Sequence, residues 1–394
     1  MRGRVILGLL TSTSLVSMLS MKQPPPIMKA VSELDASIAP FLTSAITNLY
    51  GQKTPDEELI ATQVEDYYLP MYSYLNLLLE AKQEMNTREP LFIGISAPQG
   101  CGKTTMTDII KALLHKEGKT CVSISLDDFY KTGQEQEDLA KSSANELLKL
   151  RGNAGTHDLA LLNDKMEGLR LQQESLKLPR YDKSLRAGKG DRAPEDQWDV
   201  VNDGDSKVDI VLFEGWMLGF DPIVQTTEKD TARDTIQGDM VAVNEYLSLP
   251  GYAKLHAMFD GWIVIAVSDI NAVFDWRLDA EKRMMSSGKP GMTDAQVGNF
   301  VNRFLPAYKA YLPRLHAEGI GPQPRKTIAI DETMFPKAAM VLMQLSKDIK
   351  QTCSSDTESE CTESESFSTH ELLSAPVLRV SIDTKRLPLS VDLI

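Results

Sequence analysis

Cysteine is scarce in this chain, with four among 394 residues, too few for a disulfide scaffold. Positive charge is also in short supply, because 55 acidic residues outnumber 42 basic ones and leave a formal net charge of −13. A chain this acidic lacks the broad basic face that nucleic acid needs. We therefore expect a protein of a reducing compartment that does not take nucleic acid as its main partner.

Long apolar runs are missing too, so no segment is expected to span a membrane. The first 32 residues lack acidic side chains altogether, and serine and threonine interrupt the apolar residues from Val5 to Met21. This composition is typical of an organelle transit peptide. A secretory signal and a merely disordered terminus are the alternatives for residues 1–30.

What the sequence does contain is a strand–loop–helix segment, Leu91–Thr105, with the sequence LFIGISAPQGCGKTT. Apolar and β-branched residues predict a buried strand over Leu91–Ile95, and helical periodicity resumes over Met106–Leu114. Glycines between the two let backbone N–H groups approach phosphate oxygens at a helix N-terminus. This layout is typical of a phosphate-binding P-loop. The nucleotide-binding residues that it predicts are Pro98, Gln99, Gly100, Cys101, Gly102, Lys103, Thr104 and Thr105.

Two residues of this loop have chemistry of their own. Lys103 is expected to reach the β- and γ-phosphates of ATP, and the Thr104 hydroxyl to hold Mg²⁺. The loop departs from the usual pattern in one place, because Ala97 stands where the first glycine is expected. An ordinary strand–turn–helix is the alternative, and the flanking elements favour the nucleotide site.

Short apolar strands alternate with helices along the rest of the chain. We predict an α/β fold with a mostly parallel central sheet covered by helices on both faces, and ligands at the carboxyl ends of the strands. Residues 31–90 are expected to form a helical prefix and residues 91–350 the kinase domain. The further strands are predicted at Thr120–Ser125, Asp209–Phe213, Trp262–Val267 and Lys326–Ile330. The helices are predicted at Leu34–Glu84 with a break, Leu159–Gln172, Val241–His256, Asn271–Met285 and Lys337–Ile349.

The last 44 residues, 351–394, begin with an acidic, Ser/Thr-rich segment that is too polar to fold alone. Cys353 and Cys361 lie in this segment, where they could form a redox-sensitive pair or stay as two free thiols. Leu372–Ile394 regains apolar residues, and we expect it to dock on the folded body.

Carboxylates follow two of the predicted strands. Asp127 and Asp128 come just after one strand, within reach of a γ-phosphate, where one could orient an acceptor hydroxyl. Glu214 follows another strand and could bind Mg²⁺ directly or through water. A solvated turn or a helix cap is the alternative for the adjacent pair.

Cations gather in a glycine-containing loop, at Arg180, Lys183, Arg186, Lys189 and Arg192. In an acidic protein, such a cluster favours a small anionic substrate, although a solvated face is the default interpretation. Arg151 and His157 are candidates for the same duty. Arg277 and Arg283 lie on a predicted helical arm, where they could form a mobile lid or pair on the surface.

Several segments together resemble the plant-type D-glycerate 3-kinase family. They are GISAPQGCGKTT at 94–105, LDDFY at 126–130, RGNAGTHDL at 151–159, LPRYDKS at 178–184, GKGDRA at 188–193, FEGWMLGF at 213–220 and FLPAYKAYLP at 304–313. The resemblance covers most of the chain and includes the unusual Ala97–Pro98 start of the loop. The chain is more distantly similar to the uridine kinase, phosphoribulokinase and pantothenate kinase group.

The resemblance implies ATP- and Mg²⁺-dependent phosphorylation of D-glycerate to 3-phospho-D-glycerate, a photorespiratory step. It implies that Asp127 is the catalytic base beside Lys103, and that Glu214 joins Thr104 at the metal. By motif position, it implies substrate contacts at Arg151, His157, Asp158, Arg180, Tyr181 and Asp182. With the basic N-terminus, it also favours a chloroplast location, with cytoplasm or mitochondrion as alternatives.

Three other functions are alternatives to this one. A kinase for a nucleoside such as uridine, or for another small alcohol, would not need the basic loop. A non-catalytic nucleotide-binding regulator would be expected to lack Asp127 or Glu214, and both are present. A GTP switch would carry an Asn-Lys-x-Asp segment, which the sequence lacks. The sequence does not determine the oligomeric state.

Overall fold

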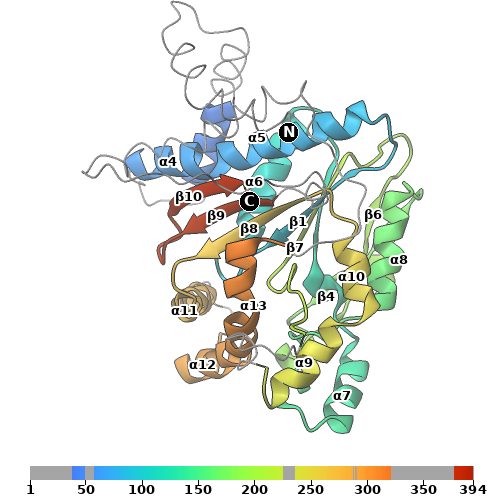
Figure 1. The fold of residues 1–394 in the computed structure, drawn as a ribbon, viewed down its shortest axis with the longest axis vertical. Coiled ribbons are helices and arrows are strands. Elements are labelled where there is room, and N and C mark those ends of the chain that lie inside the picture. The colour runs from blue at the N-terminus through green and yellow to red at the C-terminus, as the bar shows by residue number, and fades with distance from the viewer. Residues whose placement is uncertain are drawn as a thin grey trace, which may run out of the picture.

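The computed structural model describes residues 38–48, 57–224, 236–286, 288, 291–320 and 377–393, and a six-stranded sheet lies at its centre (Figure 1). The strands of this sheet are β1 (Leu91–Ser96), β2 (Cys121–Ser125), β7 (Ile210–Gly215), β8 (Gly261–Val267), β9 (Val377–Ile382) and β10 (Pro388–Leu393). Their order across the sheet is β10-β9-β8-β1-β7-β2.

Five of the six strands run parallel. β1 lies between β7 and β8, β2 pairs with β7, and β9 pairs with β8, while β10 alone is antiparallel. All six residues of β1 are buried, as expected for a strand covered on both faces. The predicted fold class is confirmed. Because the five strands are parallel, their carboxyl ends share one edge of the sheet, and the loops that carry the site residues begin there.

The chain's C-terminal end is part of this sheet. β9 pairs with β8 over Trp262–Val267, from Trp262 opposite Val377 to Val267 opposite Ile382, and Figure 1 shows β9 and β10 in red beside β8. The expectation that this end docks on the body is confirmed for residues 377–393. The strand predicted at Lys326–Ile330 and the helix at Lys337–Ile349 lie outside the described residues, as do Cys353 and Cys361.

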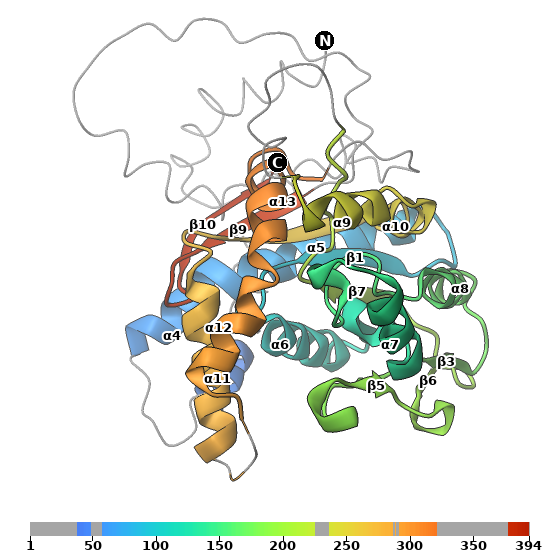
Figure 2. The same ribbon diagram turned by 90° about the horizontal axis from the view of Figure 1, so that it is seen from below.

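Helices cover the sheet, with α6 on one side and α9, α10 and α13 on the other (Figure 2). Besides a helix at residues 38–48, they are α4 (Glu57–Gln63), α5 (Leu69–Glu84), α6 (Lys103–Lys116), α7 (Gly133–Ser142), α8 (Leu159–Arg170), α9 (Asp239–Leu247), α10 (Pro250–His256), α11 (Ala272–Ser286), α12 (Asp294–Asn302) and α13 (Leu305–Glu318). The single helix predicted over Val241–His256 is wrong. It is two helices, because Pro250 has no N–H to continue α9 and instead starts α10.

Short elements fill the region between β2 and β7. They are the 3-10 turns η3 (Leu126–Phe129), η4 (Glu146–Leu148), η5 (Arg186–Gly188) and η6 (Glu195–Gln197), and the strand pairs β3 (Leu176–Leu178) with β6 (Asp199–Val201) and β4 (Tyr181–Asp182) with β5 (Asp191–Arg192). The β4–β5 hairpin contains most of the basic loop predicted from the sequence.

The helical prefix packs against the start of β8. A π-helical turn, η2 (Val64–Tyr68), joins α4 to α5. Tyr74 on α5 accepts a hydrogen bond from the Trp262 amide at 3.1 Å, and Lys82 forms an ion pair with Asp260 at 2.8 Å. These contacts lie at the amino end of the strand, away from the edge that carries the site loops. No helix in the described part of the chain is long and apolar enough to cross a membrane.

Candidate active site

The glycine loop follows β1 and ends at the first turn of α6. Ala97 donates its amide to the Gly215 carbonyl at 3.3 Å, so the loop begins against the end of β7. Gly100 and Gly102 have φ angles of 81° and 101°, a left-handed conformation that side chains with a Cβ rarely adopt. α6 then begins at Lys103. The first amides of a helix have no partner within the helix, and a phosphate site uses such amides.

Lys103, predicted to reach the phosphates, and Glu214, predicted to bind Mg²⁺, lie side by side. Lys103 Nζ donates to the carbonyl oxygens of Ala97 and Pro98 at 3.0 and 3.1 Å, and it lies 4.0 Å from a carboxylate oxygen of Glu214. Burial raises the pKa of Glu214, and Lys103 opposes that effect. A further cation nearby would therefore stabilise the ionised form of Glu214. Thr104 is exposed at the same end of α6.

The two adjacent carboxylates after β2 have different roles. Asp128 closes a capping box with Ser125 at the start of η3. It also accepts hydrogen bonds from the Tyr181 amide at 3.1 Å and from Arg180 at 3.0 Å. Every one of these contacts is internal, so Asp128 is the structural member of the pair. Asp127 takes no part in the cap through its side chain.

Asp127 faces the basic loop instead. Lys183 Nζ lies 2.6 Å from one of its oxygens, and the Tyr130 hydroxyl donates to the other at 2.8 Å. Burial alone would raise the pKa of Asp127, but Lys183, with help from Tyr130 and Lys103, outweighs it and lowers the pKa to about 2. Asp127 is therefore an ionised acceptor at any physiological pH.

Most cations of the basic loop are paired within the protein. Arg180 contacts both Asp128 and Asp199, Arg186 pairs with Glu137, and Arg192 lies 3.0 Å from Asp158. These pairs hold the β4–β5 hairpin against η3, α7 and α8. Lys183 differs, because its partner is Asp127 at the edge of the sheet.

Two arginines gather near Tyr130 without a carboxylate partner among the described residues. Arg151 donates to the Gly188 carbonyl at 3.1 Å and to the Lys189 carbonyl, with its guanidinium 5.5 Å from the centre of the Tyr181 ring. Arg303 lies over the rings of Phe300 and Phe304. Burial lowers the pKa of Arg303, and the nearby charge of Arg151 lowers it further. Two neighbouring cations in this arrangement favour an anion between them.

His157 lies behind Tyr130. The two rings stack with centroids 4.7 Å apart, and His157 Nδ1 lies 2.9 Å from the Tyr252 hydroxyl. Burial lowers the pKa of His157 to about 4, so the ring is neutral. Its Nε2 and the Tyr181 hydroxyl are buried without a hydrogen-bond partner among the described residues. Buried polar atoms of this kind need a partner, which a bound polar molecule would supply.

The remaining predicted site residues are placed elsewhere. Asp158 caps α8 through the Leu161 amide and pairs with Arg192, while Asp182 accepts two hydrogen bonds from Ser184 in a turn. Arg277 pairs with the buried Glu281 one turn along α11, and Arg283 donates to the Asp279 carbonyl at 3.2 Å. The structure brings these four residues into local contacts and not onto Asp127.

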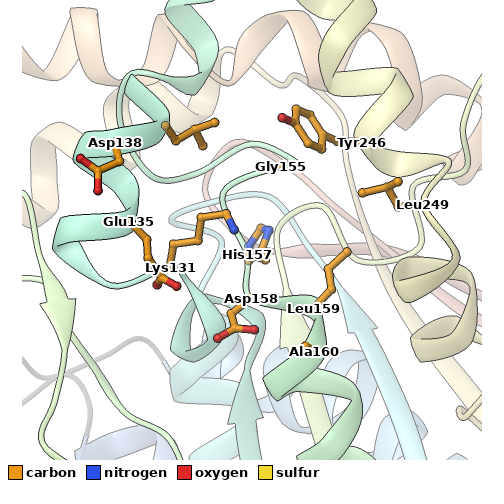
Figure 3. A pocket seen from close by; sticks show the side chains of 11 residues that line it. Lys131, Glu135, Asp138, Gly155, His157, Asp158, Leu159, Ala160, Tyr246 and Leu249 are labelled. Carbon is orange, nitrogen blue, oxygen red and sulfur yellow. The ribbon is translucent and has the colours of Figure 1, made fainter. Parts of the chain in front are cut away.

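A separate pocket of about 550 Å³ opens between α7 and the junction of α9 with α10 (Figure 3). Lys131 and His157 lie at its centre, with Glu135, Tyr246 and Leu249 around them. Neither the glycine loop nor Asp127 lines it. It shares His157 and Asp158 with the substrate contacts that were predicted from the sequence.

The sequence patterns indicate no individual role for Lys183, Arg303 or Tyr130. Lys183 and Tyr130 lie inside segments that carry the family resemblance, and Arg303 directly precedes another such segment, so their place in or beside these segments was the available signal. No group of three or more His, Cys, Asp or Glu side chains in the described ranges is arranged to hold a metal. A metal here would therefore depend on phosphate oxygens as well.

The chain is similar to known kinases in sequence and in fold. Residues 92–227 match the model of the phosphoribulokinase/uridine kinase family. The chain is 42% identical over 274 residues to D-glycerate 3-kinase, chloroplastic, of Arabidopsis thaliana. The aligned region covers 67% of this chain but only 58% of that protein. It is 36% identical over 262 residues to an uncharacterized kinase of Schizosaccharomyces pombe, covering 65% of this chain and 93% of the relative.

A solved structure of D-glycerate 3-kinase from Cryptococcus neoformans is also similar. The TM-score is 0.59 at 26% identity, and the superposition covers 83% of this chain and 98% of that one. The fold is thus shared with a protein named as a kinase, and the family match over residues 92–227 includes the glycine loop.

Proposed function

The chain belongs to the phosphoribulokinase/uridine kinase family of P-loop kinases, and we propose that it transfers the γ-phosphoryl group of ATP to the 3-hydroxyl of D-glycerate. The observation that carries this proposal is the meeting of Asp127, Lys183 and Tyr130 at the edge of the sheet, beside the glycine loop. An acceptor hydroxyl needs a carboxylate such as Asp127 to accept its hydrogen bond. An acidic acceptor molecule also needs further cations nearby.

The phosphate side of the site uses the loop amides, Lys103 and the end of α6. Phosphoryl transfer is mostly positioning and charge neutralisation. Lys103 lies on the carbonyls of Ala97 and Pro98, within a side-chain rotation of the loop interior, and would neutralise the β- and γ-phosphates there.

Magnesium would be held by Thr104 and Glu214 together with phosphate oxygens. Mg²⁺ sites in kinases use one or two protein oxygens and keep their other ligands from phosphate and water. The exposed Thr104 and the buried Glu214 fit such a set. Bound there, the ion would supply charge neutralisation on the phosphates.

Asp127 would accept the hydrogen bond of the acceptor hydroxyl. Its carboxylate is held by Tyr130 on one oxygen and by Lys183 on the other, so its direction is fixed. With a pKa of about 2, it remains ionised and orients the hydroxyl rather than removing its proton early. This role fits a loose transition state, in which the proton leaves late.

The substrate carboxylate would lie between Arg151 and Arg303. Both guanidiniums lack a carboxylate partner in the described part of the chain, and each is supported by aromatic rings. His157 Nε2 and the Tyr181 hydroxyl, both buried, are available for the 2-hydroxyl or for a carboxylate oxygen. An uncharged acceptor such as uridine would leave both arginines uncompensated.

An ADP-release assay with D-glycerate, uridine and pantothenate side by side tests the proposal. We expect turnover with D-glycerate to exceed turnover with uridine by at least about 100-fold, because a neutral acceptor leaves Arg151 and Arg303 unpaired. Pantothenate also carries a carboxylate, so it tests whether the site requires the short spacing between carboxylate and hydroxyl that D-glycerate has. Comparable or faster turnover with uridine or pantothenate would contradict the glycerate assignment while leaving the kinase fold intact.

We also propose that the enzyme acts in the chloroplast, in photorespiration. The proposal is supported by the acid-free, Ser/Thr-containing sequence of residues 1–32 and by the name of the Arabidopsis relative. Fusion of residues 1–30 to a fluorescent protein tests the location. Uniform cytoplasmic fluorescence in plant cells would overturn it.

A further inference from the structure

The turn between β9 and β10 lies beside the glycine loop, although nearly 300 residues of sequence separate them. β8 pairs in parallel with both β1 and β9, so the ends of β1 and β9 share one edge of the sheet. The turn is closed by its own hydrogen bonds: Asp383 donates to the Leu387 carbonyl at 2.9 Å, and its carboxylate accepts from the amides of Lys385 and Leu387 at 2.8 Å each.

Arg386 reaches from this turn to the loop. Its Nε donates to the Gly100 carbonyl at 2.8 Å, and its guanidinium lies 5.0 Å from the centre of the Trp276 ring. Arg386 has a φ of 66°, which is uncommon for a residue with a side chain. Its amide is fixed in that conformation by a 3.0 Å hydrogen bond to the Asp383 carbonyl.

Trp276 on α11 completes a three-way contact. Its indole nitrogen donates to the Thr384 carbonyl at 2.8 Å. A β-carbon at Gly100 would lie 2.8 Å from the Trp276 β-carbon, so the loop and α11 touch with no room for a side chain. The glycine loop, α11 and the C-terminal turn therefore hold one another in place.

The hydrogen bond from Arg386 has a consequence inside the loop. In a trans peptide, the N–H points opposite to the C=O, so the Cys101 amide points away from Arg386. A charge-assisted hydrogen bond on the Gly100 carbonyl polarises that peptide unit. The Cys101 amide then becomes a better donor to a phosphate oxygen on the other side.

Charge around the turn also favours an anion. Among the described residues, no carboxylate lies within ion-pair distance of Arg386. Burial lowers the pKa of Arg386 and Arg283 on α11 lowers it further, while Asp279 opposes them, so a second cation and one carboxylate lie in the same neighbourhood. Two cations at one end of a phosphate-binding loop gain from a bound polyphosphate.

We propose that Arg386 is a positioning residue for the nucleotide, which fixes the glycine loop from its carbonyl side and so makes the C-terminal hairpin part of the site for a nucleoside di- or triphosphate. This inference rests on the proposed binding of ATP at the loop, and it does not depend on which acceptor is phosphorylated.

The test measures nucleotide affinity alone, with a fluorescent ADP analogue and no acceptor present. Arg386→Ala is expected to weaken binding about tenfold, the usual effect of losing a hydrogen bond from a charged group. Arg386→Lys, which keeps the charge and a donor, is expected to recover most of that loss. In turnover assays, the Ala variant should raise KM for ATP with little change in KM for D-glycerate.

Arg379→Ala is the matched control. Arg379 lies on the same hairpin, where it contacts the His316 carbonyl and Asp392 instead of the loop, and its removal should leave ADP affinity within twofold. Arg386→Ala binding within twofold of wild type would overturn the proposal, as would an equal loss in Arg379→Ala or no recovery in Arg386→Lys. Should the Ala variant fail to fold, Arg386→Gln is compared with Arg386→Lys by the same criteria.

Discussion

Residues 97–105 would present main-chain amides to their ligand, whereas residues 127–192 and Arg303 would present side-chain charges. The first half is built from a strand end, two glycines with positive φ and a helix N-terminus. The second half depends on ion pairs and ring contacts between residues far apart in the chain, such as Lys183 with Asp127.

This difference separates general from specific binding. A backbone cradle recognises phosphate in any nucleotide, because every residue supplies the same N–H group. Side-chain charges recognise one acceptor, because their identity and direction are particular to this fold. Substitutions in residues 97–105, the cradle half, should therefore weaken the binding and use of ATP. Substitutions in residues 127–192 and Arg303, the acceptor half, should weaken the binding and use of D-glycerate.

The largest effect is expected from Asp127→Asn. The amide cannot accept the hydroxyl proton, so kcat should fall by about 10²–10⁴-fold while ADP affinity stays within a few-fold. Steady-state kinetics and ADP titration measure the two. Asp138→Asn, an exposed acid on α7, is the control and should leave kcat unchanged. A kcat for Asp127→Asn within threefold of wild type would remove this residue from the mechanism.

Lys103→Ala tests the cradle half. Losing the side-chain cation that we place on the β- and γ-phosphates should lower kcat/KM for ATP by about 10²–10³-fold, with a much smaller change in the affinity for D-glycerate. Lys116→Ala at the far end of α6 is the control. If KM for D-glycerate changed as much as kcat/KM for ATP, the two halves would not be separable in the way described.

Arg303→Ala tests the acceptor half in the opposite direction. We expect KM for D-glycerate to rise about 10–100-fold, because a charge-assisted contact to the carboxylate is lost, while KM for ATP stays within twofold. Arg314→Ala on α13, which removes only an exposed pair with Glu318, serves as the control. An unchanged KM for D-glycerate would place the carboxylate elsewhere.

A smaller effect is expected in the pH profile of Lys183→Ala. Burial raises the pKa of Asp127, and Lys183 makes the largest of the contributions that lower it. Loss of Lys183 should therefore raise the pKa of that carboxyl, and a larger share of it will be protonated as the pH falls. The ratio of kcat at pH 5.5 to kcat at pH 8 should therefore drop by at least about twofold relative to wild type. Arg186→Gln, which removes a surface pair with Glu137, should not change this ratio. Equal ratios in wild type and Lys183→Ala would contradict the coupling.

The lowered pKa of Asp127 also makes the stability of the folded protein depend on pH. The folded-state pKa of Asp127 is lowered, to about 2, so its stabilising contribution is fully present above about pH 4. That contribution is lost as the pH falls through 4 toward 2.

Sequence alone predicted the parts of the molecule whose cause is local. The glycine loop, β1 and the start of α6 are contiguous, and hydrophobic periodicity with two glycines was enough to place them. Pro250 was visible in the sequence as well, yet the apolar pattern on both sides of it suggested one helix where there are two.

Pairings across long distances in the chain were not predictable in the same way. Residue type and spacing do not distinguish Asp127 from Asp128. The family resemblance pointed to Asp127, and the contacts of Asp128 with Arg180 and Tyr181 give the physical reason, because they tie Asp128 into the local structure. The cations of the basic loop looked alike, but four of the five, Arg180, Lys183, Arg186 and Arg192, pair with carboxylates that lie 34 to 56 residues away in the sequence. Arg386 was assigned to a tail, because nothing local indicated that β9 joins β8.

The most direct test of the account is a crystal structure with D-glycerate and a non-hydrolysable ATP analogue bound together. It should show the carboxylate between Arg151 and Arg303, the 3-hydroxyl on Asp127, and the γ-phosphate in the glycine loop beside Lys103. D-glycerate bound away from Asp127, or with its carboxylate distant from both arginines, would contradict the assignment of the acceptor half.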